Sequence, residues 1–396
     1  MYLPRELEEK VLRVFGSKFI LIRGPRRSGK TTLLKRIKEI RGGEYVTFED
    51  PIAREAFLRD PIGFVKERGT PLYLDEVQYL GEEGAKALKL IYDRLGEGPV
   101  VLTGSGAFDI KMDLLRYLVG RVYLFDLLPL RFSEVASWEG KDTFLIYKRG
   151  HKRFERLLEG EEKLPERSES LEKLYDLYCI WGGYPEIVIN KDRELLSSLV
   201  TTTIEEDIIK YFSLREGKKL WNVVKRLAVI TGNLLDYSSL GVSYPTAQEY
   251  LSILERSFVL KTIPTFSTNK LTELTKREKV YFYDSGFRNQ LIGTFSGIEE
   301  RPDGGATLEN SVWTQLTKYG EVLYWRTKSK AEVDFILRRV DGSIIPVEVK
   351  ITGKITPSLL SFIEKYQPEI ALVLSQDTFE KKVKNTTVYG IPYYYI

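Results

Sequence analysis

The chain has 396 residues, with 60 Lys or Arg against 56 Asp or Glu, so its formal net charge is only +4. This near balance excludes a globally basic nucleic-acid-binding protein, and any DNA contact has to be local. The single Cys excludes a disulfide framework, and no apolar run reaches the length of a membrane span. We therefore expect a cytoplasmic protein of several domains with no membrane partner. Abundant Lys, Glu, Arg and Tyr beside one Cys and two Met favour a thermophilic source.

A phosphate-binding motif lies near the N-terminus, where Gly24–Thr31 fits the pattern G-x4-G-K-[ST]. The apolar run Phe19–Ile22 before it predicts a strand, and helical spacing after it predicts a helix. This order aims backbone N–H groups and a helix N-terminus at one point, which is an anion site. We expect Lys30 to reach the β- and γ-phosphates of a nucleotide and Thr31 to bind Mg²⁺. The residues expected to hold the nucleotide are Gly24, Pro25, Arg26, Arg27, Ser28, Gly29, Lys30, Thr31 and Thr32.

A second apolar strand, at residues 72–74, ends in Asp75 and Glu76, the form of a Walker B element. We expect Asp75 to hold Mg²⁺ through water and Glu76 to polarise the attacking water as a general base. The alternative interpretation is a strand that ends in a solvated acidic turn.

A third apolar run, Val100–Leu102, ends in the hydroxyl residues Thr103 and Ser105. We expect this strand to lie between the other two, with one of these hydroxyls sensing the γ-phosphate. A strand at Tyr45–Phe48 and a helix at Ala85–Leu95 alternate with these elements. The alternation predicts an α/β domain whose mostly parallel sheet is covered on both faces.

At this point the chain resembles AAA-type ATPases of archaea and bacteria, with affinities to signalling ATPases. The resemblance includes Gly120-Arg121, the segment Leu127–Glu134 and the Gly-Gly-Tyr-Pro run at Gly182–Pro185. It implies ATP as the nucleotide and a helical lid on the nucleotide domain. It also makes Arg121 a candidate catalytic finger on the γ-phosphate of its own subunit or of a neighbour in a homo-oligomer. The alternative is an ordinary ion-paired Arg.

The middle of the chain is helical. Residues 142–171 are dense in charge and predict an exposed insertion. Helices at Trp221–Ile230 and Pro245–Phe258, followed by β-like runs at Phe258–Ile263 and Lys279–Tyr283, have the outline of a winged helix. The second helix has polar residues that suit DNA but also acids that repel phosphate, so DNA remains a candidate partner on the strength of the hairpin cations. These cations are Lys270, Lys276 and Arg277.

A second chemistry follows residue 303. Glu309 opens a predicted helix, Asp334 lies in a strand, and Glu348 and Lys350 lie two residues apart in the next strand, hence on one face. This order resembles the PD-(D/E)XK nuclease superfamily, although Val333 stands where that superfamily usually has Pro. The resemblance implies a restriction-endonuclease-like α/β domain. In it, Asp334 and Glu348 hold Mg²⁺, while Lys350 and Glu309 assist catalysis. The alternative is an inherited fold that only docks DNA or a protein.

The turn at Asp341-Gly342 sets the register of these two strands. A two-residue loop would place Asp334 opposite Val349, on the wrong face. A three-residue loop pairs Asp334 with Lys350 and keeps Glu348 on the same side. The apolar residues predicted to share the opposite face are Val333, Phe335, Leu337, Val347 and Val349.

We therefore predict four parts, with boundaries at residues 1–140, 141–215, 216–300 and 301–396. They are a P-loop ATPase core, a helical insertion and lid, a winged helix, and a nuclease-like domain. The predicted function is Mg²⁺-dependent ATP hydrolysis that acts on DNA. The alternative is a regulatory ATP switch with an inactive docking tail.

Overall fold

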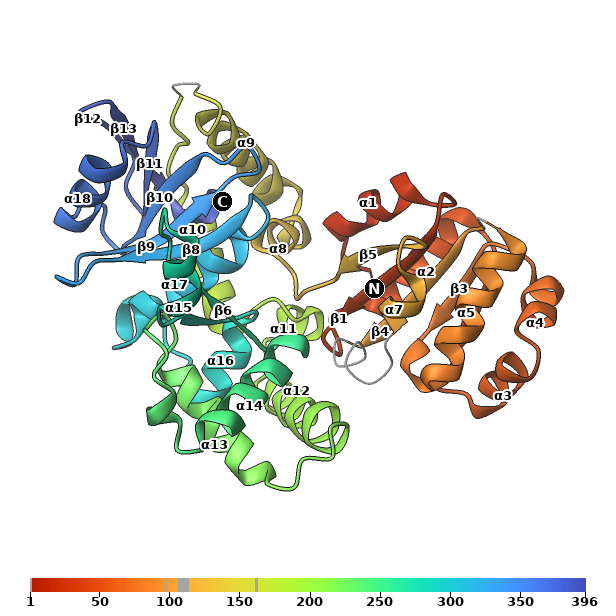
Figure 1. Ribbon diagram of the computed structural model, residues 1–396. Coiled ribbons are helices and arrows are strands. Elements are labelled where there is room, and N and C mark those ends of the chain that lie inside the picture. The colour runs from red at the N-terminus through yellow and green to blue at the C-terminus, as the bar shows by residue number, and fades with distance from the viewer. Residues whose placement is uncertain (1, 97, 106–113, 161–162) are drawn as a thin grey trace.

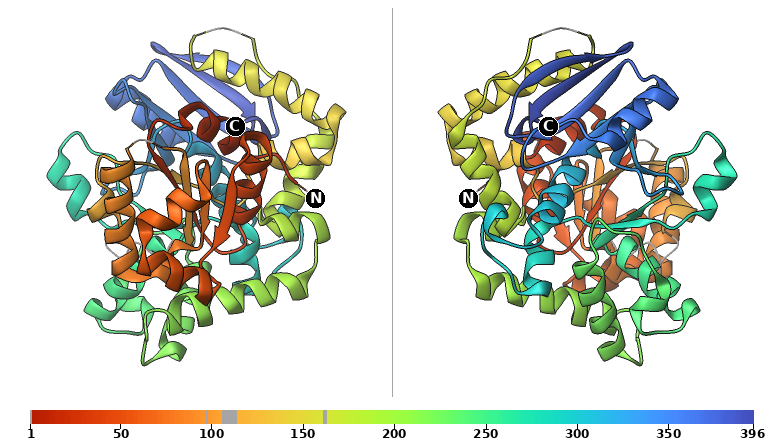
Figure 2. Two further views of the ribbon diagram at one scale, coloured as in Figure 1. Left: turned by 90° about the vertical axis from the view of Figure 1, so that its right-hand side faces the viewer. Right: turned by 90° about the vertical axis from the view of Figure 1, so that its left-hand side faces the viewer.

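The computed structural model describes residues 2–96, 98–105, 114–160 and 163–396 and contains three sheets. Figure 1 shows the red and orange N-terminal part on the right, the blue C-terminal sheet at the upper left and the green helices below that sheet. Figure 2 shows the same parts from two sides. In the described part of the chain, none of the helices combines the length and apolar character needed to cross a lipid bilayer.

The N-terminal sheet has five parallel strands in the order β2-β3-β4-β1-β5. Alternate side chains of β1 enter two cores, Phe19 and Leu21 in one and Ile20 and Ile22 in the other, as in a sheet covered on both faces. The expected α/β fold is confirmed, with β4 between β1 and β3. The strands are β1 (Phe19–Gly24), β2 (Glu44–Thr47), β3 (Leu72–Asp75), β4 (Val100–Ser105) and β5 (Val122–Asp126). The helices are α1 (Glu6–Val14), α2 (Lys30–Arg41), α3 (Pro51–Arg59), α4 (Pro61–Arg68), η1 (Val77–Leu80), α5 (Gly81–Leu95) and α7 (Leu114–Leu118).

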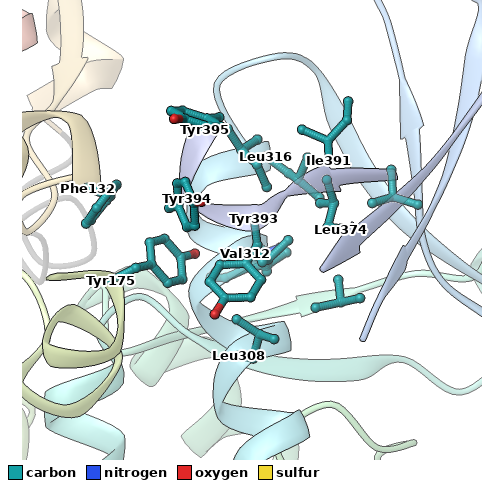
Figure 3. Packing of buried hydrophobic residues seen from close by; sticks show 14 of the residues in the cluster. Phe132, Tyr175, Leu308, Val312, Leu316, Leu374, Ile391, Tyr393, Tyr394 and Tyr395 are labelled. Atoms are coloured by element: carbon teal, nitrogen blue, oxygen red, sulfur yellow. The ribbon is translucent and has the colours of Figure 1, made fainter. Parts of the chain in front are cut away.

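A run of helices follows, of which α9 and α10 pack against the end of the chain, whereas α12 and η2 pack in the core of the helices that come next. The charged residues expected to form an exposed insertion occupy only one face of α9, whose other face buries Tyr147, Phe154 and Leu157. That face meets η5 (Tyr393–Tyr395), and Figure 3 shows these tyrosines in the same buried cluster as Phe132 and Tyr175. The helices are α8 (Phe132–Glu139), α9 (Lys141–Leu157), α10 (Glu169–Trp181), α11 (Pro185–Asn190), α12 (Arg193–Thr202) and the π-helix η2 (Thr203–Lys210).

The predicted helix–turn–helix and hairpin outline is present. Ser243 caps the second helix, and β6 pairs antiparallel with β7. β6 begins two residues later than expected, because Phe258 has a left-handed backbone with φ 56°. The elements are α13 (Gly217–Val229), η3 (Tyr237–Leu240), α14 (Tyr244–Arg256), β6 (Leu260–Ile263), α15 (Lys270–Thr275), β7 (Lys279–Phe282) and α16 (Ser285–Ile292).

The C-terminal sheet has six strands in the order β12-β13-β11-β10-β9-β8, and it is also covered on both faces. Side chains of α17 enter the core on one face, and those of α18 enter the core on the other. The elements are η4 (Ile298–Glu300), α17 (Gly304–Leu316), β8 (Glu321–Arg326), β9 (Glu332–Arg338), β10 (Ile344–Val349), α18 (Pro357–Tyr366), β11 (Ile370–Ser375), β12 (Phe379–Val383) and β13 (Thr386–Pro392).

The predicted register of β9 and β10 was wrong by two residues. Ile344 pairs with Arg338, and continuing that register places Asp334 opposite Glu348 rather than Lys350. The reason is the position of the turn: the Arg339 N–H donates to the Ser343 carbonyl oxygen at 2.9 Å, so the three-residue loop is residues 340–342 and not 341–343. Asp341 in this loop accepts hydrogen bonds from the N–H and the hydroxyl of Ser343, at 2.9 and 2.6 Å. A register shift of two residues does not by itself move a side chain to the other face of the sheet.

One apolar side chain departs from the predicted pattern of the two strands. Val333 packs in the α18 core, whereas Phe335, Leu337, Val347 and Val349 share the α17 core. An irregular pairing of β8 with β9 accompanies this difference, since Val333 faces Trp325 where the register shifts.

Candidate functional site

The predicted phosphate loop joins the carboxyl end of β1 to α2. Since β1, β3 and β4 are parallel neighbours, Gly24, Asp75 and Thr103 arrive at one edge of the sheet. Arg27 (φ 61°) and Gly29 (φ 97°) have left-handed backbones, which turn the loop into a concave anion-binding nest. At Gly24 a Cβ atom would lie 2.1 Å from the Leu127 carbonyl oxygen, so only glycine fits there.

Lys30 is the first residue of α2, and its side chain is only 5% exposed. Its Nζ donates to the carbonyl oxygens of Gly24 and Pro25, at 3.1 and 2.8 Å. Burial lowers the pKa of Lys30, although the carboxylates of Glu76 and Asp75 oppose the shift. The ammonium thus has neutral partners that an anion can replace.

Asp75 at the tip of β3 is buried and gathers three hydroxyl groups. Its carboxylate accepts from Thr31 Oγ1 at 2.8 Å, from the Tyr45 hydroxyl at 2.7 Å and from Thr103 Oγ1. Thr31 and Asp75 therefore meet as predicted, and Thr103 reaches the same point. The Ser105 side chain lies outside the described residues. Sequence reasoning missed Tyr45, whose only signal was its place on a strand beside β3.

Glu76 follows Asp75 with a left-handed backbone, φ 56°. Its N–H donates to Thr103 Oγ1 at 3.2 Å, and its carboxylate accepts from Gln78 Nε2. Burial raises the pKa of Glu76, while the Lys30 ammonium lowers it. A carboxylate with a raised pKa at a strained turn suits the role of a base.

Two cavities flank the loop. One, of about 240 Å³, is lined by Arg26, Lys30, Glu49, Glu76, Gln78 and Tyr79 together with Glu206, Asp207 and Tyr211 from η2 and its end. The other, of about 200 Å³, is lined by Tyr2, Leu3, Arg5, Gly29 and Thr32 together with Pro185, Glu186, Ile189 and Asn190. Elements from the middle of the chain therefore close both sides of the loop.

Arg5 fastens the N-terminal segment to the loop. This buried side chain donates to the Ser28 carbonyl oxygen and to the Leu128 carbonyl oxygen, each at 2.7 Å, and to Glu134 Oε1 at 3.0 Å. The Leu127–Glu134 segment that carried part of the family resemblance is thus a support of the phosphate loop. No local sequence pattern marks Arg5 as a functional residue.

The candidate finger Arg121 lies elsewhere. It precedes β5, at the amino end of a sheet whose carboxyl end carries the phosphate loop. Its Nε lies 2.7 Å from Asp93 Oδ1. A role on the γ-phosphate of its own subunit is therefore wrong, and the ion-paired alternative describes the observed contact.

The C-terminal acids also come together. Lys350 Nζ lies 2.9 Å from Asp334 Oδ2 and 2.9 Å from Glu348 Oε2. Glu348 is buried, and its other oxygen accepts from Thr356 at 2.9 Å. Burial raises the pKa of Glu309 to about 7, and Asp334 is near enough to contribute to that rise.

A lysine from the hairpin enters this acidic cluster. Lys279 on β7 is 1% exposed, and its Nζ lies 2.7 Å from Glu332 Oε1 and 3.5 Å from Glu309 Oε1. The Tyr281 hydroxyl also donates to Glu309. Sequence reasoning missed Lys279, because the contact joins β7 to a helix and a strand that follow much later in the chain.

Three family models match separate parts of the chain. Residues 16–136 match the family described as "AAA domain". These residues form an AAA-type P-loop ATPase-like domain. Residues 172–297 match "Domain of unknown function (DUF8612)" and residues 304–394 match "Domain of unknown function (DUF4143)". Neither description specifies a winged helix or a nuclease, so both remain predictions.

Relatives along most of the chain are themselves uncharacterized. Two proteins, from Mycobacterium bovis and Mycobacterium tuberculosis, are each 23% identical over 354 residues, which cover 86% of this chain and 71% of theirs.

Solved structures resemble the chain only loosely. A signal transduction ATPase (STAND protein) of Pyrococcus horikoshii with a tetratricopeptide repeat sensor is 14% identical with a TM-score of 0.33. The match covers 80% of this chain but 45% of that one. The RuvB Holliday junction branch migration motor of Thermotoga maritima is 17% identical over 66% of this chain and 90% of its own, with a TM-score of 0.31. Orc1 of Aeropyrum pernix, solved with DNA, is 16% identical over 74% and 93%, with a TM-score of 0.25. TM-scores this low assign no function.

Proposed function

We propose that this chain binds ATP with Mg²⁺ and hydrolyses it at the edge of the N-terminal sheet. The observation that carries the proposal is the convergence of Lys30, Thr31, Asp75, Glu76 and Thr103 at one end of three parallel strands. These residues come from three places in the sequence, the start of α2, the end of β3 and the end of β4, which together supply the groups that a phosphate site of this type requires.

The donor set fits a magnesium nucleotide. The Ser28 hydroxyl in the loop is buried and has no hydrogen-bond partner among the described residues, which suits a ligand oxygen. Thr31 and Asp75 supply the hard oxygen donors that Mg²⁺ prefers, Asp75 through water. When bound, the ion supplies positive charge to the phosphates. Lys30 would then exchange its carbonyl partners for phosphate oxygens.

Glu76 is the group that we expect to accept a proton from the attacking water, and Thr103 holds it in place through the Glu76 N–H. The cavity on the other side of the loop, with Leu3, Pro185 and Ile189 in its wall, offers an apolar site for the base.

Lys30→Ala and Glu76→Gln test this function. We expect Lys30→Ala to abolish ATP binding, measured by titration calorimetry. Glu76→Gln should keep binding but lower turnover roughly 100- to 10,000-fold, the usual range for loss of a general base. Normal turnover in both variants would refute the ATPase proposal.

Mg²⁺-dependent DNA cleavage is a second candidate function, favoured by the contacts among Asp334, Glu348 and Lys350. As arranged, the cluster does not fit a metal ion. Its carboxylates already hold ammonium groups, and no group of three or more acidic, His or Cys side chains among the described residues is placed to bind one. Metal-dependent cleavage would require the Lys350 ammonium to move away from Asp334 and Glu348, so that these carboxylates could bind the ion.

Cleavage of supercoiled DNA in Mg²⁺ or Mn²⁺, with and without ATP, tests this second function. Asp334→Ala is compared with Glu380→Gln, which removes an exposed carboxylate on β12. Cutting that is lost only in Asp334→Ala would support a nuclease. No cutting, or equal cutting by both variants, would favour the docking alternative.

DNA binding by the helix–turn–helix part is a related proposal. One of the two acids on α14 is already occupied, because Glu255 accepts from the N–H and the hydroxyl of Thr262, both at 2.8 Å. Lys276 and Arg277 at the hairpin are exposed, whereas Lys270 pairs with Glu273 at 2.8 Å. Reversing the charge of Lys276 should weaken DNA binding and flatten its salt dependence, and an unchanged salt dependence would count against the proposal.

A further inference from the structure

The two arginines of the phosphate loop are both held by the middle part of the chain. Arg26 Nη1 lies 3.0 Å from Asp207 Oδ1 on η2, in the larger of the two cavities. Arg27 Nη1 lies 3.6 Å from Glu186 Oε2 on α11, which lines the other cavity. Figure 1 shows α11 and α12, which leads into η2, as neighbouring helices of the green part.

The larger cavity carries an excess of negative charge before any phosphate enters. Four carboxylates, those of Glu49, Glu76, Glu206 and Asp207, line the cavity with two cations, those of Arg26 and Lys30. A third cation, Lys210, pairs with Glu206, so the carboxylates still outnumber the cations. Asp207 Oδ2 is buried with no hydrogen-bond partner among the described residues. A γ-phosphate would bring further negative charge to the same space, and Coulomb repulsion at this range is strong in a partly enclosed site.

The ion pair between Arg26 and Asp207 holds η2 against the phosphate loop, and a phosphate group can replace Asp207 in it. Arg26 is 48% exposed and Asp207 is 19% exposed, and ion pairs with this much exposure are weak. A phosphate group offers a guanidinium two oxygens in bidentate geometry, which makes it a stronger competitor for Arg26. η2 is also a π-helix of eight residues, a geometry that is rare and is often found at functional sites.

We propose that Asp207 sets the preference of the cleft between nucleoside triphosphate and diphosphate, and that the γ-phosphate releases η2 by taking Arg26 from Asp207. This inference rests on the proposed ATP site and adds its regulation. The released helix leads directly into α13, and Trp221 on α13 donates from Nε1 to Glu205 on η2 at 2.6 Å. Binding of the γ-phosphate is therefore transmitted through η2 to the helix–turn–helix part, which consists of α13, η3 and α14.

Equilibrium binding tests the preference. The dissociation constants of MgADP and of the non-hydrolysable triphosphate MgAMP-PNP are measured by calorimetry for wild type, Asp207→Asn and Glu186→Gln. Removing the Asp207 charge should tighten MgAMP-PNP about tenfold and MgADP much less, because only the triphosphate approaches that carboxylate. Glu186→Gln is the matched control, since it frees the neighbouring arginine on the other side of the loop and should change both affinities alike.

The outcomes distinguish failure of the proposed role of Asp207 from failure of the proposed ATP site. An unchanged or lower ratio of the two affinities in Asp207→Asn, with MgADP still bound, would overturn the inference alone. Failure of wild type to bind either nucleotide would instead overturn the proposed ATP site.

Trp221 reports the release of η2 directly. MgAMP-PNP should change the tryptophan emission of wild type, MgADP should not, and Trp221→Phe should remove the change. Equal responses to both nucleotides, or no response to either, would show that the γ-phosphate does not move η2.

Discussion

Two buried lysines lie in opposite electrostatic settings, one in the phosphate loop and one in the C-terminal acidic cluster. Lys30 contacts only carbonyl oxygens of its own loop, and burial lowers its pKa. Burial acts on Lys279 in the same direction, but Glu309 and Glu332 outweigh it and raise the pKa of Lys279 above its ordinary value. No carboxylate contacts the Lys30 ammonium, so it can bind the anion of a ligand, whereas the Lys279 ammonium already contacts the carboxylates of Glu309 and Glu332.

The difference separates a binding site from a structural cluster. An ammonium that is buried without a carboxylate in direct contact costs folding free energy and is retained where a ligand needs it. An ammonium that already has two carboxylates has little to offer a ligand, and its removal is costly because it leaves those carboxylates without their cation. On this comparison the N-terminal site is built for nucleotide, whereas each lysine of the C-terminal cluster already contacts two carboxylates.

The largest expected effect is on the free energy of unfolding, and replacing each of the two lysines tests the comparison. Lys279→Met should lower the free energy of unfolding by about 3 kcal/mol at pH 8, because it leaves the part-buried Glu309 without its cation, whereas Glu332 keeps Arg326 at 2.7 Å. Lys30→Met should lower the free energy of unfolding much less, because burial already disfavours the Lys30 charge and no carboxylate contacts its ammonium directly, although Glu76 and Asp75 lie near. Urea denaturation of the two variants and wild type measures both values.

Nucleotide binding by the same two variants complements the measurement of stability. Lys30→Met should lose nucleotide binding although its fold is intact, and Lys279→Met should keep nucleotide binding at temperatures where it is folded. Equal destabilisation by the two substitutions would show that the two settings do not differ as described.

A smaller effect is expected from Glu309 as the pH changes. The pKa of Glu309 is about 7 in the folded protein against an ordinary value of 4.5, so the folded state holds a proton that the unfolded state releases. The resulting stability is fully present below pH 4.5 and is lost as the pH rises through about 7. Glu309→Gln should remove this contribution, so that the difference in unfolding midpoint between wild type and variant changes between pH 5 and pH 8.

Glu380→Gln on β12 is the control for this pH series, because its side chain is exposed. Parallel curves for wild type and Glu309→Gln would mean that Glu309 does not titrate in this range. The same series links the two stability predictions, since Lys279→Met should cost less at pH 5, where Glu309 is protonated.

Local sequence patterns were enough to predict the site residues that lie at the end of an apolar strand or in the phosphate loop. Lys30, Asp75 and Thr103 follow apolar strands, and parallel strands bring such ends to one edge whatever the loops do. The faces of Asp334 and Glu348 were also predictable, because alternation survives a register error of two residues.

Contacts between distant segments were not predictable in this way. Lys279, Asp207 and Arg5 each act on a site far away in the sequence, and nothing in their own neighbourhoods marks them. The exposed insertion predicted for residues 142–171 failed for the same reason, since the apolar face of α9 is covered by the last residues of the chain.

The smallest expected effect concerns Arg121, which tests whether the nucleotide site is complete within one chain. Its exposed pair with Asp93 lies at the opposite end of the sheet from Lys30, so Arg121→Ala should leave the unfolding midpoint and the rate of ATP hydrolysis unchanged. Hydrolysis is measured over a wide range of protein concentration for wild type and variant. A turnover that rises with wild-type concentration but not with that of Arg121→Ala would restore this residue as a finger supplied by a neighbouring subunit. A turnover independent of concentration in both would leave Lys30 and the groups around Asp75 to carry the reaction within one chain.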